Sequence, residues 1–95
     1  MLVVAGHIRV ASERREAYLE GCVSVVEQAR GTHGCLDFAI TPDLIDPERV
    51  NVFELWESRD AVEKFRGSGP SDEQGAEMLS ASVAEYEVGD VRSLT

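Results

Sequence analysis

The stretch FELWESRDAVEKF, from Phe53 to Phe65, decides the fold of this chain. Its first residues end a segment, Val50 to Trp56, that is apolar at both sets of alternating positions. A strand that avoids water on both faces lies in the middle of its sheet. Ser58 then offers a helix N-cap, and apolar residues follow at helical spacing, at Ala61, Val62 and Phe65. We therefore expect a central strand that leads directly into a short helix.

The segments on either side continue an alternation of strands and helices. They are a strand from Leu2 to Val10, a helix from Ser12 to Arg30, a strand from Gly34 to Thr41, a helix from Asp72 through Met78 and Leu79, and a strand near Val83 to Val88. The order β-α-β-β-α-β is typical of an α+β ferredoxin-like fold. In that fold an antiparallel sheet carries its helices on one face.

The face of the sheet opposite the helices is predicted to be apolar. With strict alternation along each strand, this face carries Val3, Ala5, Cys35, Ala39, Phe53 and Leu55. Such a face needs a partner, and a second copy of the chain is the simplest one. We therefore expect a homodimer in which two sheets face each other.

The composition indicates a single domain, residues 1–95, and narrows its partners. Eighteen acidic residues against nine basic ones give a formal charge of −9, which repels nucleic-acid phosphates and anionic lipid headgroups. No apolar run approaches the roughly 18 residues of a membrane span, and the first residues carry no basic leader. We expect a cytoplasmic protein that binds neither nucleic acid nor membrane. Cys22 and Cys35 fit no zinc-finger or CxxC spacing and are expected as buried thiols.

The sequence carries no motif for a cofactor or a metal. It has no GxGxxG, P-loop or GxSxG element, and His7 and His33 are too far apart to form a helical metal pair. We therefore expect no cofactor and no metal site.

Three segments carry a resemblance to a known family. They are Gly34-Cys35-Leu36-Asp37-Phe38, Asp46-Pro47-Glu48-Arg49, and Phe53-Glu54-Leu55-Trp56-Glu57-Ser58 with Ala61 after it. Together they resemble the antibiotic biosynthesis monooxygenase (ABM) family over about residues 2 to 89. The resemblance implies a ferredoxin-like domain that pairs into a dimeric α/β barrel. It also implies a cofactor-independent monooxygenase that acts on a quinol or polycyclic aromatic substrate with O2.

One departure from the family pattern supports an alternative function. Many members carry a histidine nine residues after the tryptophan, where this chain has Phe65. Haem-degrading relatives use that histidine as the axial iron ligand, and phenylalanine cannot bind iron, so haem degradation is disfavoured. With fewer proton-transfer groups, the chain can instead be a non-catalytic dimeric barrel that binds a small hydrophobic ligand.

Glu54 and His7 are the candidate catalytic residues. Glu54 shares a strand face with Trp56 beneath the predicted helices, where a carboxylate must either pair or lose its charge. Burial that raises its pKa would make it a base near neutral pH, whereas a structural salt bridge is the other interpretation. His7 lies on the opposite face of its strand, and its side chain suits proton transfer at neutral pH or a purely structural role.

Four aromatic residues are candidate substrate contacts, and each can instead belong to the core. Trp56 offers a broad stacking face and one N–H donor. Tyr18 and Tyr86 can point hydroxyl groups into a pocket, and Phe65 occupies the position of the family histidine. These four residues complete the predicted site.

Overall fold

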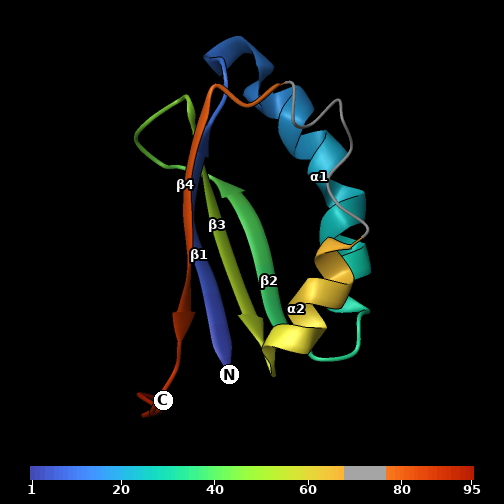
Figure 1. Ribbon diagram of the computed structural model, residues 1–95. Helices are drawn as coiled ribbons and strands as arrows, with labels where there is room; N and C mark the ends of the chain where they lie inside the picture. The colour runs from blue at the N-terminus through green and yellow to red at the C-terminus, as the bar shows by residue number, and fades with distance from the viewer. Residues whose placement is uncertain (68–76) are drawn as a thin grey trace.

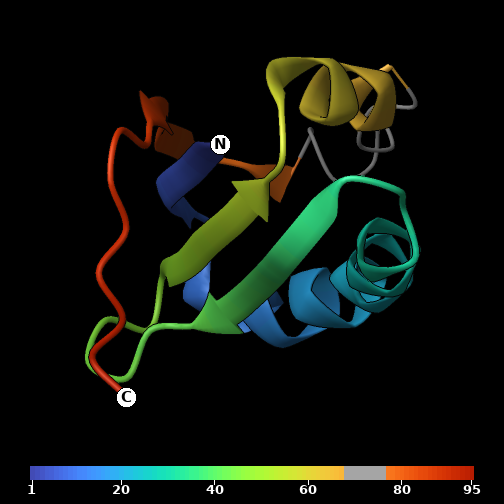
Figure 2. The ribbon, with the colours of Figure 1, turned by 90° about the horizontal axis from the view of Figure 1, so that it is seen from below.

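The computed structural model describes residues 1–67 and 77–95. Its elements are β1 (Leu2–Arg9), the short 3-10 helix η1 (Ser12–Arg14), α1 (Arg15–Arg30), β2 (Cys35–Pro42), β3 (Arg49–Trp56), α2 (Arg59–Arg66) and β4 (Ser80–Glu87). The strands form one antiparallel sheet in the order β2-β3-β1-β4. Figures 1 and 2 both place α1 and α2 on the same side of this sheet.

This arrangement confirms the predicted α+β ferredoxin-like fold. β3 lies between β2 and β1, as its two apolar faces predicted. Ser58 caps α2, because its hydroxyl oxygen accepts a hydrogen bond from the Ala61 N–H at 3.2 Å. Ser12 forms no side-chain cap and begins η1, so α1 starts three residues later than predicted, at Arg15.

The helix predicted to start at Asp72 falls mainly on residues outside the described part of the chain. Met78 and Leu79, which the prediction placed in that helix, lie in the non-helical approach to β4. The Leu79 N–H donates to the Arg9 carbonyl at 2.8 Å and so joins this approach to the end of β1. None of the described helices is long and apolar enough to cross a membrane.

A β-bulge in β2 changes which of its side chains point toward the helices, compared with the prediction. Cys35 pairs with Trp56 and Asp37 pairs with the next residue, Leu55, so Leu36 is an extra residue in the ladder. The bulge changes the alternation and turns Cys35 to the helix side, where it packs against the core. The prediction that Cys35 belongs to the uncovered sheet face is therefore wrong.

The core lies between the sheet and the two helices and has two parts. Near α2 the buried side chains are Leu2, Val4, Ala29, Phe38, Trp56 and Val62. Toward the start of α1 they are Ile8, Val10, Tyr18, Cys22 and Val50. Residues of β1 contribute to both parts at every second position, as strand geometry requires.

The loop between β2 and β3 is held by charged and polar side chains at one end of the sheet. Asp43 accepts hydrogen bonds from Asn51 and from the backbone N–H groups of Ile45 and Asp46. These bonds, led by the one from Asn51, lower the pKa of Asp43 to about 2. Arg15 donates to three carbonyl groups of the same region, so this arginine helps to hold the loop.

Candidate functional site

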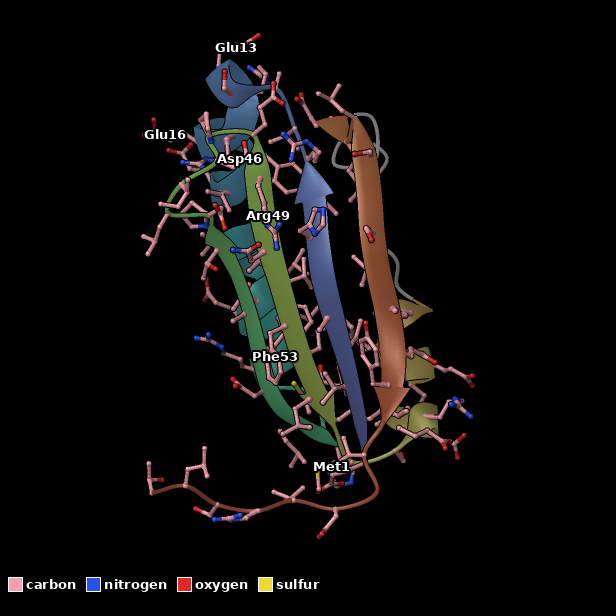
Figure 3. The ribbon with its side chains drawn as sticks, turned by 90° about the vertical axis from the view of Figure 1, so that its left-hand side faces the viewer. Met1, Glu13, Glu16, Asp46, Arg49 and Phe53 are labelled. Carbon is pink, nitrogen blue, oxygen red and sulfur yellow. The ribbon has the colours of Figure 1, made fainter. Side chains whose placement is uncertain are left out.

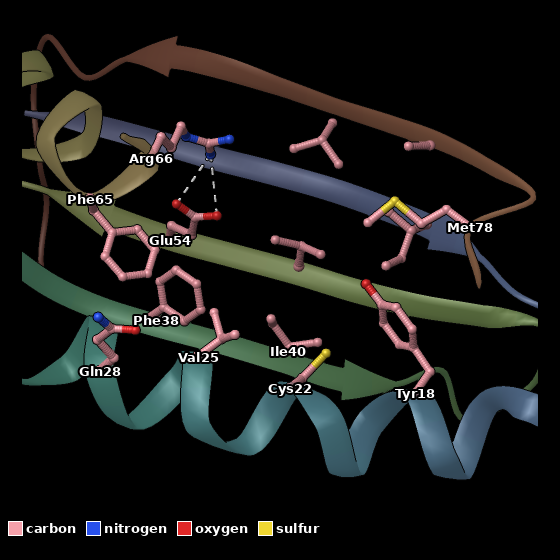
Figure 4. Close-up of a pocket in the computed structure, with 14 residues that line it drawn as sticks. Tyr18, Cys22, Val25, Gln28, Phe38, Ile40, Glu54, Phe65, Arg66 and Met78 are labelled. Carbon is pink, nitrogen blue, oxygen red and sulfur yellow. Dashed lines mark hydrogen bonds and ion pairs between the residues drawn. The ribbon is translucent and has the colours of Figure 1, made fainter. Parts of the chain in front are cut away.

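A cavity of about 250 Å³ lies between the sheet and the helices (Figure 4). Its lining comes from every strand, both helices and the approach to β4: Ile8, Tyr18, Cys22, Val25, Gln28, Phe38, Ile40, Val52, Glu54, Phe65, Arg66, Met78, Ala81 and Val83. The volume lies just below the roughly 300–1,000 Å³ of typical small-molecule sites. The cavity therefore suits a ligand of one or two rings.

The polar groups of the cavity stand apart from one another. Tyr18 lies near one end, and Glu54 with Arg66 lies toward the other, as Figure 4 shows. The wall between these ends is mainly aliphatic and aromatic. An apolar wall with a few separated polar groups is the usual design of a site that binds and orients a small organic molecule.

Glu54 is the one buried charged residue among those that the structure describes, with 6% of its surface exposed. It points toward the helices because it shares parity with Val50 and Trp56, which pair with the helix-facing positions of β1. The Trp56 indole N–H donates to its Oε1 at 2.9 Å. Nη2 of Arg66 donates to both carboxylate oxygens, at 3.3 and 3.4 Å. Of the two predicted outcomes for this carboxylate, the structure shows pairing.

Arg66 is the site residue that the sequence prediction missed. It is the last residue of α2, and its side chain is half exposed. Val62 is fully buried, and a residue four positions later lies on the same helix face. That spacing marks Arg66 as a candidate cation for the buried carboxylate, but only the packing of α2 on the sheet shows that the two side chains meet.

Trp56 packs behind the wall of the cavity and does not line it. The indole is fully buried and packs against Phe38 and Phe65, with ring centroids 6.4 and 5.4 Å away. These two phenylalanines lie on the cavity wall, so they cover the indole. Phe65, a candidate substrate contact, therefore lies on the cavity wall. Trp56 instead holds Glu54 through its N–H group.

Tyr18 and Cys22 are the other titratable groups of the lining, one turn apart on α1. Burial raises the pKa of Tyr18 well above its usual range, and interactions with Cys22 add to the effect. Burial also raises the pKa of Cys22, and its hydrogen bond with Tyr18 partly opposes that rise. Both groups are therefore neutral at pH 7, and among the described lining residues the charged ones are Glu54 and Arg66.

His7 and Tyr86 lie on the other face of the sheet, away from the cavity. His7 pairs with Asn51 and Ser82, and Tyr86 pairs with Val3, all at positions that alternate with the helix-facing ones. In β4, Val83 and Glu85 pair with Gly6 and Val4 and so face the helix side. Tyr86, the next residue along the strand, therefore faces the uncovered side. The structure thus places Glu54, Tyr18 and Phe65 on the wall of one cavity, and separates them from His7 and Tyr86.

The described residues hold no group of three or more histidine, cysteine or carboxylate side chains placed to bind a metal ion. The two cysteines of the chain form no disulfide with each other. Burial raises the pKa of the Cys35 thiol, and the nearby charge of Glu54 raises it further.

Comparison with known proteins extends this description. A protein of Synechocystis sp. named as uncharacterized protein sll1783 is 27% identical over 62 residues, which cover 65% of this chain and 42% of that protein. The chain therefore matches less than half the length of this relative.

Solved structures resemble the chain over nearly its whole length. A protein from Deinococcus radiodurans, named as a monooxygenase of antibiotic biosynthesis, superimposes with a TM-score of 0.88 at 18% identity and covers 100% of this chain and 99% of its own. The protein Rv0793 from Mycobacterium tuberculosis gives a TM-score of 0.81 at 20% identity, with 97% and 98% covered. At these identities the likeness establishes the fold.

The family follows from the sequence match. The model of the family described as "Antibiotic biosynthesis monooxygenase" matches residues 1–74, well over half of the chain. The match includes α1, β1 to β3 and α2, and with them Glu54, Trp56, Phe65 and Arg66 of the cavity region. The chain belongs to the antibiotic biosynthesis monooxygenase family.

Proposed function

We propose that this protein is a cofactor-independent monooxygenase that oxidises a small electron-rich hydroxyaromatic compound, such as a quinol, with O2. The observation that carries the proposal is the buried carboxylate of Glu54 on the wall of a mainly apolar cavity. A base on the wall of a mainly apolar cavity can take the proton of a bound phenol. Family membership supports the reaction class.

The proposed reaction draws its electrons from the substrate. The phenol O–H bond breaks, and its proton moves to Glu54. The phenolate then gives one electron to O2, and the superoxide and phenoxyl radical combine to form a C–O bond at a ring carbon that bears hydrogen. Glu54 returns its proton to the peroxide, the C–H proton leaves as the O–O bond breaks, and that proton and the released hydroxide form water. The products are a quinone and water.

The chain supplies three things to this chemistry. Phe38 and Phe65 present aromatic surfaces against which a flat ligand can stack. Trp56 holds the Glu54 carboxylate in one orientation by its hydrogen bond. The mainly apolar wall reduces the contact of the charged intermediate with water, which strengthens the electrostatic contacts that it makes with the protein.

Oxygen uptake and product mass, measured over naphthohydroquinones and anthrols, test the proposal. The expected product gains one oxygen and loses two hydrogens. Glu54→Gln should lower turnover by about 10²- to 10⁴-fold, the usual contribution of a general base. Glu63→Gln, an exposed acid on α2, is the matched control and should leave turnover unchanged. Absence of any rate above the spontaneous one, or full activity in Glu54→Gln, would contradict the proposal.

A non-catalytic binding protein is the second candidate, and two observations favour it. Phe65 replaces the histidine that many relatives carry, and Glu54 is already held in an ion pair with Arg66. This candidate predicts that aromatic compounds bind in the cavity without oxygen uptake. Repeated turnover by the purified protein would exclude it.

We also propose that the working form of the single domain, residues 1–95, is a homodimer. Figure 3 shows the sheet face that no helix covers, with Phe53 near its middle. The register places Val3 beside Leu55 and Tyr86, and Ala5 beside Phe53. Phe53 is 39% and Tyr86 56% exposed, so the face presents apolar surface that a second sheet can bury.

A further inference from the structure

We propose that Arg66 binds the ionised oxygen of the ligand, so that the cavity selects hydroxyaromatic compounds that bind as phenolates. This inference rests on the proposed function, and it specifies which group of the substrate lies at the Glu54 end of the cavity.

The guanidinium group of Arg66 has more donors than its contacts with the described residues use. It carries five N–H groups in a planar fork that matches an oxyanion. Among the described residues, its hydrogen bonds both start from Nη2 and end on Glu54. Nε and Nη1 donate to none of the described residues, and the Arg66 side chain lines the cavity, so these groups can reach a bound ligand.

The ion pair is asymmetric in burial, which favours exchange of partners. The Glu54 side chain is 8% exposed, whereas the Arg66 side chain is 49% exposed. Glu54 is fixed on the central strand β3 and held by Trp56, whereas Arg66 ends a helix of eight residues and is followed by Gly67. Reorientation of Arg66 toward a bound oxyanion therefore requires no change in the sheet.

The balance of charge among Glu54, Arg66 and the ligand also supports the binding of a phenolate by Arg66. Before proton transfer, the negative charge of Glu54 is balanced by Arg66, and the phenol is neutral. After transfer, Glu54 is neutral and the phenolate carries the charge, so Arg66 again has one anionic partner. The net charge within the apolar wall stays the same throughout, which avoids the high cost of an unpaired charge in such surroundings.

No other charged side chain of the described lining competes for this role. Tyr18 and Cys22 face the same cavity, but burial raises the pKa of both groups, so they are neutral near pH 7. Gln28 is polar and uncharged, and the lining residues other than these, Glu54 and Arg66 are apolar. Arg66 is thus the cation available to a phenolate in the cavity.

The test uses 4-nitrophenol, whose phenolate form is coloured, and nitrobenzene, which has no hydroxyl group. Spectrophotometric titration across pH should show that the wild-type protein binds the phenolate at least about tenfold more tightly than the phenol, because a charge-assisted hydrogen bond exceeds a neutral one. Arg66→Gln should abolish this preference, and Arg66→Lys should keep part of it. Nitrobenzene should bind equally to all three proteins.

Three further variants make the outcome decisive. Glu54→Gln should bind the phenolate more tightly than the wild type, because it removes the carboxylate that competes for Arg66. The double variant Glu54→Gln with Arg66→Gln leaves no buried unpaired charge, so it should fold, bind nitrobenzene and lack the preference. Arg59→Gln, at the first position of α2 and paired with Glu85 and Glu87, is the matched control and should behave as the wild type.

The results separate this inference from the proposed reaction. Equal phenolate preference in wild type and Arg66→Gln would overturn the inference, and so would a loss of nitrobenzene binding in Arg66→Gln and in the double variant. If the preference follows Arg66 but no compound consumes oxygen, the inference holds and the oxygenase proposal fails. If oxygen uptake depends on Glu54 but phenolate binding ignores Arg66, the oxygenase proposal holds and the inference fails.

Discussion

Tyr18 places a hydroxyl group at the end of the cavity away from Glu54, and only 7% of this residue is exposed. Burial penalises the tyrosinate anion, which is why the pKa of Tyr18 rises well above its usual range. In the folded protein Tyr18 should therefore remain protonated where an exposed tyrosine has already ionised. As a neutral hydroxyl that donates to Cys22, it can accept a hydrogen bond from a ligand over the whole range of working pH.

This difference between folded and unfolded chains predicts a loss of stability at high pH. Above about pH 10 the unfolded chain releases the Tyr18 proton and the folded chain retains it, so the unfolded state binds fewer protons and unfolding becomes easier as pH rises. The free energy of unfolding, measured by urea titration from pH 8 to pH 11, should fall above about pH 10. Tyr18→Phe should show a smaller fall.

Absorbance supplies an independent check of the same prediction. The chain has two tyrosines, so Tyr86→Phe leaves Tyr18 as the only one. The folded variant should show no tyrosinate absorbance up to about pH 11, well past the ordinary tyrosine value. A titration midpoint near pH 10 in the folded state would contradict the assigned burial.

The sequence correctly predicted which side chains of a single strand lie next to each other. The alternation of β3 predicted that Glu54 and Trp56 would lie together beneath the helices, and the 2.9 Å hydrogen bond between them confirms this. The cation for Glu54 could not be read in the same way, because Arg66 belongs to another element. The packing of α2 on the sheet brings the two together, and no local periodicity reports that distance.

Among the elements, β1 depends on one glycine. Gly6 has a φ of 154°, and a Cβ added there would lie 2.0 Å from the Ser82 carbonyl oxygen of β4. Gly6 pairs with Val52 on one side and Val83 on the other, and both of these line the cavity. The close approach of β4 at this point therefore shapes the cavity wall as well as the sheet.

Gly6→Ala should destabilise the protein by about 2–4 kcal/mol, because the side chain meets backbone that cannot move aside and the conformation is unfavourable for any L-residue. The midpoint of urea unfolding measures the loss. Gly89→Ala is the matched control, since nothing lies within 4 Å of the position where its Cβ would be. Equal stability of the two variants would show that β4 does not approach β1 as described.

The elements themselves were largely predictable, and their exceptions have local causes. Strand alternation and helical spacing gave the order of strands and helices, because most side chains follow the rule that apolar groups face the core. The bulge at Cys35 was not predictable, since one extra residue in a strand leaves the composition of that strand unchanged. The facing of β4 was also predicted wrongly: Tyr86 was expected to point into the pocket, but the pairing with β1 turns Glu85 to the helix side and Tyr86 to the uncovered face.

For the whole molecule, the proposed homodimer rests on the uncovered face of the sheet. Each copy carries a formal charge of −9, so two copies repel each other at long range. Association must then come from apolar contact over the sheet, and salt should strengthen it by screening the repulsion. Sedimentation velocity over a concentration series should therefore show a dimer at low micromolar protein, with tighter association at higher ionic strength.

Phe53→Glu should weaken this dimer at least tenfold, on the order expected for a central apolar residue of an interface that is replaced by a charge. Phe53 lies on the uncovered face and is 39% exposed, so the single chain can accept the change without loss of its core. Val23→Glu, on the outer surface of α1 and 55% exposed, adds the same charge on the opposite side of the molecule and is the matched control. If both variants dissociate equally, charge alone controls association. If the wild type sediments as a monomer, the apolar face serves another partner and the barrel arrangement does not apply to this chain.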